Sequence, residues 1–77
     1  MNPLLKECLQ QIQNLNSEEV FLVKDLFRGY EWNRIDRTAR LNLGILFKNE
    51  VLQRPELGIE MLDKTSSNQQ KYKKNNK

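Results

Sequence analysis

Arginine, threonine and asparagine side chains recur in the middle of the chain, and these residue types can read the base edges of DNA. Residues 24–48 hold six basic and three acidic groups. In the major groove, arginine can bind guanine and asparagine can bind adenine, whereas other basic groups neutralise phosphate. The candidate base contacts are Arg37, Thr38, Asn42 and Asn49, and the candidate phosphate contacts in this segment are Arg34 and Lys48.

A second basic cluster lies at the end of the chain. Residues 64–77 carry five lysines and no acid, whereas residues 1–63 carry 8 basic and 10 acidic groups. This split favours a polyanionic partner, and if about six groups contact phosphate, binding should weaken steeply with added salt. The alternative for residues 73–77 is that they only keep the protein soluble. The lysines expected to follow the DNA backbone are Lys64, Lys71, Lys73 and Lys74.

The chain lacks the side chains that common catalytic and metal-binding sites need. The chain has no histidine and one cysteine, Cys8, which excludes imidazole acid–base catalysis and leaves no zinc ligand set. No serine has a histidine to activate it, the acidic residues show no metal-ligand spacing, and no glycine-rich phosphate loop is present. We therefore expect neither an enzyme nor a cofactor.

The bulk composition is that of one small soluble domain. The chain has 77 residues, 38% of them hydrophobic and 30% charged, and its longest apolar run, Val20–Val23, is far short of the ~20 residues of a membrane span. A lone cysteine fits a reducing compartment. We expect a cytoplasmic protein that does not associate with membranes.

The first half of the chain predicts a helix, a short strand and a second, brief helix. Asn2 and Pro3 can begin a helix over residues 3–15, whose apolar residues recur at spacings of three and four. Val20–Val23 favours a strand, with a helix as the open alternative. Asp25 can cap a brief helix that Gly29 ends, and residues 30–35 then form a connector in which Trp32 fills the core.

The longest predicted helix begins after Asp36 and ends near Gln53, before Pro55. Its core stripe is Ala39, Leu43, Leu46, Phe47 and Val51, and Gly44 at the border predicts a close backbone approach.

The outward face of this helix has an unusual composition. Arg40 should pack its stem and extend its charged head outward. Three large apolar residues also point outward: Leu41, Ile45 and Leu52. Three interpretations of these residues stay open: the N-terminal helix covers them, they form a partner or dimer interface, or they face DNA.

The last part of the chain predicts a β-hairpin. Extendable runs flank the polar residues Thr65–Asn68, although Tyr72 is the one good strand former of the second run. The element order of helix, strand, helix, helix and hairpin is that of a winged helix-turn-helix, mainly α with a small β wing. We expect one domain over residues 1–72 and a basic, disordered tail over residues 73–77.

Several residues match a known pattern. Asp25-Leu26-Phe27, Trp32, the run Arg40-x-x-Leu43-Gly44-x-x-Phe47, Gly58 and Tyr72 together resemble a family of small, uncharacterised single-domain proteins of bacteria, phages and mobile elements. The resemblance covers residues 20–72 and implies a winged-helix-like domain, without an activity or a site.

Two functional hypotheses follow. The first is a small winged-helix regulator from a phage or mobile element that binds duplex DNA, with a homodimer as an open possibility. The second is an inhibitor or adaptor that binds a host protein through the outward apolar face of Leu41, Ile45 and Leu52.

Overall fold

The first helix begins where the sequence predicts, but its α-helical part ends earlier than residue 15. In the computed structural model, which describes residues 2–75, α1 spans Pro3–Gln11 and continues as a 3-10 turn over Ile12–Asn14. The side-chain oxygen of Asn2 accepts the N–H groups of Leu4 at 2.8 Å and Leu5 at 3.3 Å, which satisfies donors that a helix start otherwise leaves free. The buried face of this segment consists of Leu5, Cys8 and Ile12.

The strand predicted over Val20–Val23 is shorter than expected. β1 spans only Val20–Phe21, and the chain then turns into a 3-10 helix over Val23–Leu26. The Asp25 carboxylate causes this turn, because it accepts the N–H of Leu22 at 2.9 Å and so closes the chain back on itself. Asp25 thus lies inside the helical turn instead of capping a following helix.

The prediction for Gly29 and the connector after it is wrong. Gly29 begins a helix, α2, which spans Gly29–Asn33. The Arg28 N–H donates to the Glu31 carboxylate at 3.1 Å, a side-chain bond that can start a helical turn without a serine or aspartate cap. Trp32, on this turn, packs against Phe27 with ring centroids 5.7 Å apart.

The long helix has the predicted bounds. α3 spans Arg37–Gln53, and the Asp36 side chain accepts the N–H of Ala39 at 2.8 Å. Leu43, Phe47 and Val51 are its buried residues. A 3-10 turn over Pro55–Leu57 follows, and Gly58 adopts the left-handed conformation with φ of 70°, which reverses the chain into the sheet.

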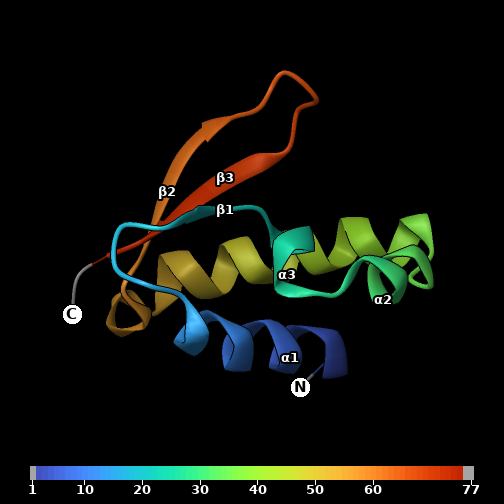
Figure 1. Cartoon of the computed structure of the whole chain (residues 1–77), viewed down its shortest axis with the longest axis horizontal. Helices are drawn as coiled ribbons and strands as arrows, with labels where there is room; N and C mark the ends of the chain where they lie inside the picture. Colours follow the sequence, from blue (N-terminus) through green and yellow to red (C-terminus); the bar gives the residue numbers. More distant parts are fainter. Residues whose placement is uncertain (1, 76–77) are drawn as a thin grey trace.

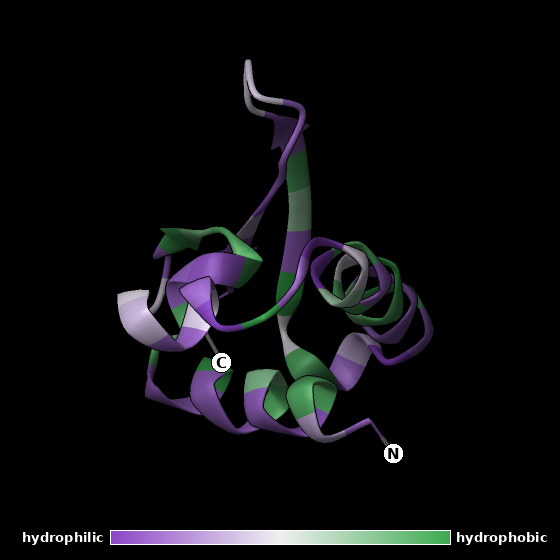
Figure 2. Ribbon diagram, turned by 90° about the vertical axis from the view of Figure 1, so that its right-hand side faces the viewer, coloured by the Kyte–Doolittle hydropathy of each residue, from purple (hydrophilic) through white to green (hydrophobic). Residues whose placement is uncertain are grey.

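A hairpin completes a three-stranded antiparallel sheet. β2 spans Ile59–Lys64 and β3 spans Gln70–Lys74, and the strand order is β1-β3-β2. β3 is therefore the central strand, pairing Phe21 and Met61 with Tyr72 from its two sides. The hairpin projects away from the helices (Figure 2).

The end of the domain lies later than predicted. Lys73 and Lys74 belong to β3, so the tail expected from residue 73 does not begin there. The predicted tail also includes residues 76 and 77, which lie outside the described residues.

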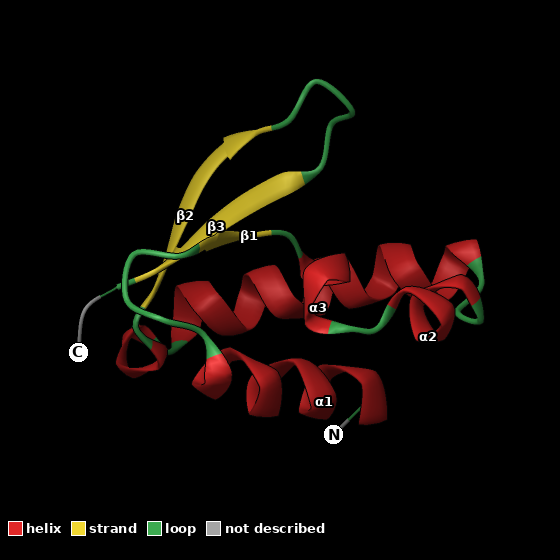
Figure 3. Cartoon of the chain, viewed as in Figure 1, coloured by secondary structure: helices red, strands yellow, loops and turns green. Residues whose placement is uncertain are grey.

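The core lies between the sheet and the helices. α1 and α3 lie side by side, with the sheet above α3 (Figures 1 and 3). Tyr72 from β3 stacks on Phe21 from β1 at 5.8 Å between ring centroids, and Phe47 from α3 meets Tyr72 edge-on at 5.0 Å. The result is a mainly helical domain with a small antiparallel sheet, as the sequence predicts at this level of detail.

Candidate nucleic-acid interface

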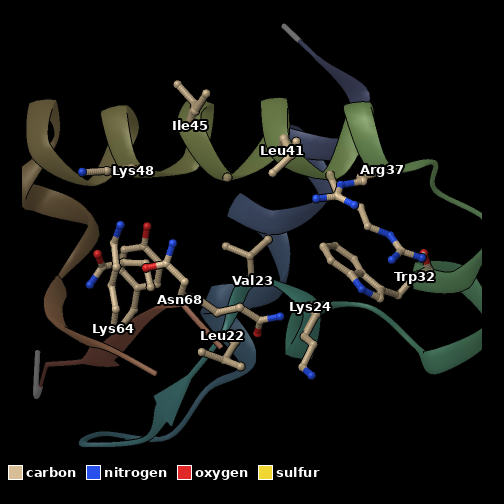
Figure 4. A pocket seen from close by; sticks show the side chains of 15 residues that line it. Leu22, Val23, Lys24, Trp32, Arg37, Leu41, Ile45, Lys48, Lys64 and Asn68 are labelled. Atoms are coloured by element: carbon tan, nitrogen blue, oxygen red, sulfur yellow. The ribbon is translucent and has the colours of Figure 1, made fainter. Parts of the chain in front are cut away.

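A groove of about 460 Å³ separates α3 from the β2–β3 hairpin. Figure 4 shows Lys48 of α3 at one end, near Lys64 and Asn68 of the hairpin, and Arg37 and Trp32 at the other end. Residues 22–24, which leave β1, lie between the two ends. The groove is thus assembled from four segments that are distant in the sequence.

The charged residues in the groove lining are all cationic. Five cationic side chains contribute to it, and no acidic residue of the described chain does. With no carboxylate among them, the positive potential of these groups is not neutralised inside the groove. The cationic residues are Lys24, Arg37, Arg40, Lys48 and Lys64.

Arg40 is held inside the groove wall. Its guanidinium lies 5.0 Å from the centroid of the Trp32 ring, and its Nη2 donates to the Trp32 carbonyl oxygen at 2.8 Å. Its Nε is buried without a hydrogen-bond partner among residues 2–75. The expectation that the head of Arg40 extends outward is therefore wrong, because the ring and the carbonyl of Trp32 hold it back.

The outward apolar residues of α3 are not covered. Leu41 and Ile45 are each 60% exposed and Leu52 is 59% exposed. The interpretation that the N-terminal helix covers them is wrong, since the buried residues of α1 share the core with Leu43, Phe47 and Val51 on another face of α3. We refer to Leu41, Ile45 and Leu52 as the apolar ridge.

The predicted base contacts are accessible. Thr38, Asn42 and Asn49 are exposed on α3 and lie outside the groove lining, whereas Leu41 and Ile45 of the apolar ridge belong to the lining. Arg34, just after α2, is exposed and lies 5.0 Å from the Tyr30 ring centroid.

The lysines predicted to contact phosphate near the end of the chain occupy different environments. Lys73 pairs with Glu18 at 3.3 Å and with Glu60 at 3.7 Å, and the hydrogen bond that it donates to the Glu18 carboxylate raises the pKa of Lys73. The Lys74 Nζ donates to the carbonyl oxygen of Ile12 at 2.9 Å and so fastens β3 to the end of α1. Lys71 is half-buried on β3 and does not line the groove.

The structure therefore brings together only part of the predicted set. Arg37, Lys48 and Lys64 share one groove, whereas Lys73 and Lys74 are engaged elsewhere. The sequence analysis missed Lys24 and Trp32 as groove residues. The basic middle segment already contained Lys24, but its place opposite α3 depends on the pairing of β1 with a strand at the far end of the chain.

No group of three or more possible metal-ligand side chains occurs within residues 2–75. In the same part of the chain, no helix has the length and apolar character to cross a bilayer.

Comparison with known proteins identifies the family. Residues 6–74 match the family described as Domain of unknown function (DUF1413), and the chain belongs to this family. The expectation of a small uncharacterised family is confirmed to that extent. Searches of curated proteins and of solved structures give no match.

Proposed function

We propose that this DUF1413 domain is a winged-helix protein that binds duplex DNA and acts as a regulator by occupying it. In this reading α2 and α3 are the helix-turn-helix pair, and the β2–β3 hairpin is the wing. The proposal is supported by the order of the elements and by the strand order β1-β3-β2. A helix-turn-helix places its second helix in the major groove, and here that helix is α3.

The single observation that carries the proposal is the cationic groove without acids. A phosphate backbone running between α3 and the hairpin would pass Arg37, Lys48 and Lys64 in turn. Phosphate contacts fix the register of a protein on DNA. They would leave the exposed side chains of α3 turned toward the base edges.

A salt titration tests this function. We expect labelled duplex DNA to bind at low salt and to lose affinity steeply between about 50 and 200 mM salt. Lys48→Gln and Lys64→Gln should each weaken binding and reduce the slope of log affinity against log salt by about 0.9, which is the contribution of one phosphate contact.

Matched lysines outside the groove serve as controls. Lys6→Gln changes an exposed lysine of α1, and Lys73→Gln changes a lysine already paired with two acids. Both variants should keep the wild-type slope. If the wild-type protein does not bind duplex DNA at low salt, or if all four variants behave alike, the groove is not a DNA site.

A second candidate function is favoured by the exposure of the apolar ridge. Exposed apolar side chains that lie together often mark protein interfaces, so an adaptor or inhibitor of a host protein would use Leu41, Ile45 and Leu52. Ile45→Lys should abolish binding of a purified partner and leave the fold intact, because Ile45 is 60% exposed. Binding that survives this substitution would remove the ridge from consideration.

A further inference from the structure

We propose that α3 reads A·T base pairs, with Leu41 and Ile45 contacting the methyl groups of thymine. Asn42 and Asn49 would bind adenine. This inference rests on the proposed DNA-binding function and names the kind of DNA. It starts from an apparent conflict, which is that Leu41 and Ile45, two large apolar side chains of α3, line the same groove as the cations.

The conflict disappears when the chemistry of the outward face is compared with that of the four base pairs. Thymine is the base that presents an apolar group, its C5 methyl, in the major groove, and adenine presents the donor–acceptor pair that asparagine matches. Leu41, Ile45, Asn42 and Asn49 are all exposed on this face. Both members of an A·T pair therefore have suitable partners on α3.

Guanine has fewer suitable partners on the same face. Arg37 and Lys48 are the exposed cationic residues of α3 that could bind guanine, but they lie at the two ends of the groove, where phosphate is the expected ligand. Leu41 and Ile45 lie between them on the helix. The only acid within α3 is Glu50, and its carboxylate is held by Arg54 at 3.0 Å. No carboxylate is thus left on the outward face to accept from cytosine or to repel the backbone.

Charge makes duplex DNA a better occupant of this face than an apolar protein surface. Leu41 and Ile45 of the apolar ridge line the groove between Arg37 and Lys48, and Asn42 and Asn49 are exposed outside it. Docking a purely apolar partner there would desolvate Arg37 and Lys48 without giving them a counter-charge. A polyanion with apolar methyl groups in its groove matches both features.

Replacement of thymine by deoxyuridine isolates the methyl group. Three duplexes of equal length are compared by fluorescence anisotropy: an A·T-rich duplex, the same duplex with every thymine replaced by deoxyuridine, and a G·C-rich duplex. Deoxyuridine keeps the base pairing and the O4 acceptor, and it lacks only the methyl. Burial of one methyl-sized group is worth about a fourfold change in affinity. If Leu41 and Ile45 each contact one thymine methyl, we expect wild-type protein to bind the thymine duplex about sixteenfold tighter than the uridine duplex.

Two sets of variants complete the test. Leu41→Ala/Ile45→Ala shortens exposed side chains on a helix, so the fold should persist, and this variant should bind the thymine and uridine duplexes equally. Asn42→Ala/Asn49→Ala should keep the sensitivity to the methyl group and lose much of the preference for A·T over G·C.

The possible failures are distinguishable. Equal binding of wild-type protein to the thymine and uridine duplexes overturns this inference and leaves the DNA-binding function standing. A uridine effect that persists in Leu41→Ala/Ile45→Ala also overturns it, because DNA shape would then be the cause. Absence of binding to every duplex at low salt overturns both. Sedimentation provides a further test. If the wild-type protein is a dimer and Leu41→Ala/Ile45→Ala is a monomer, the apolar ridge mediates protein association and the inference is overturned.

Discussion

At the scale of single residues, Arg40 joins the core to the groove. Its guanidinium stacks on Trp32 and donates to the Trp32 carbonyl oxygen, so it fixes α2 against α3 while adding positive charge to the groove wall. The planar, delocalised head of arginine suits both contacts, and a lysine ammonium cannot reproduce them together.

Arg40→Lys should therefore lower the free energy of unfolding, although it keeps the charge. Loss of the stacking contact and of the hydrogen bond should cost about 1–2 kcal/mol. Urea unfolding followed by the fluorescence of Trp32, the single tryptophan, measures the change. Arg37→Lys, at an exposed position, is the control and should change stability little; similar losses in both variants would argue against the Trp32 contact.

At the scale of elements, Gly44 and Gly58 differ in how well they would tolerate a side chain. A Cβ built on Gly44 meets no atom within 4 Å, so the close backbone approach predicted for this position is wrong, and Gly44 borders the open groove instead. Gly58 has φ of 70°, a conformation that costs other residues energy.

Gly44→Ala should raise the free energy of unfolding by about 1 kcal/mol, because alanine is the better helix former and nothing obstructs its methyl. Gly58→Ala should lower it by about 1 kcal/mol. Thermal unfolding of both variants provides the comparison. A destabilised Gly44→Ala protein would show that a neighbour presses on this part of α3.

The elements could be predicted wherever a local signal marks their ends. Asp36 and Pro55 bracket α3, and Asn2 with Pro3 begins α1, so these bounds are confirmed. Gly29 and Leu22 carried no such signal, because the turns there depend on the carboxylates of Glu31 and Asp25 three residues later. The exposure of Leu41, Ile45 and Leu52 depends on which face of α3 receives α1. That choice is a tertiary one, and the local pattern left it open.

At the scale of the whole molecule, the core contains two groups whose pKa values are raised by burial, the Cys8 thiol and the Tyr72 hydroxyl. Burial raises the pKa of the Cys8 thiol from 9.0 to about 12, with a smaller contribution from Glu7. Burial also raises the pKa of Tyr72 from 10.0 to about 12, with a smaller contribution from Cys8. Both groups are thus protonated in the folded protein over a range where the unfolded chain releases their protons.

This difference predicts unfolding in alkali. Because the unfolded chain binds fewer protons than the folded protein above pH 9, the contribution of these groups is complete below pH 9 and is lost as the pH rises toward 12. Cys8→Ala and Tyr72→Phe should each flatten the fall of the unfolding free energy between pH 9 and 12. Urea titrations at several pH values measure this fall in the unfolding free energy. If it is unchanged in Cys8→Ala/Tyr72→Phe, other groups cause the alkaline unfolding.

The central place of β3 governs when the protein can fold during synthesis. Val20 has its partner in Lys73, and backbone bonds join Glu18 and Glu19 to Lys74. A nascent chain on the ribosome can coil its helices early, but Phe21 meets no strand until residue 74 has left the exit tunnel. Until then the aromatic centre of the domain stays exposed to solvent and to chaperones, so the sheet can form only after residues 18–74 have all emerged from the ribosome.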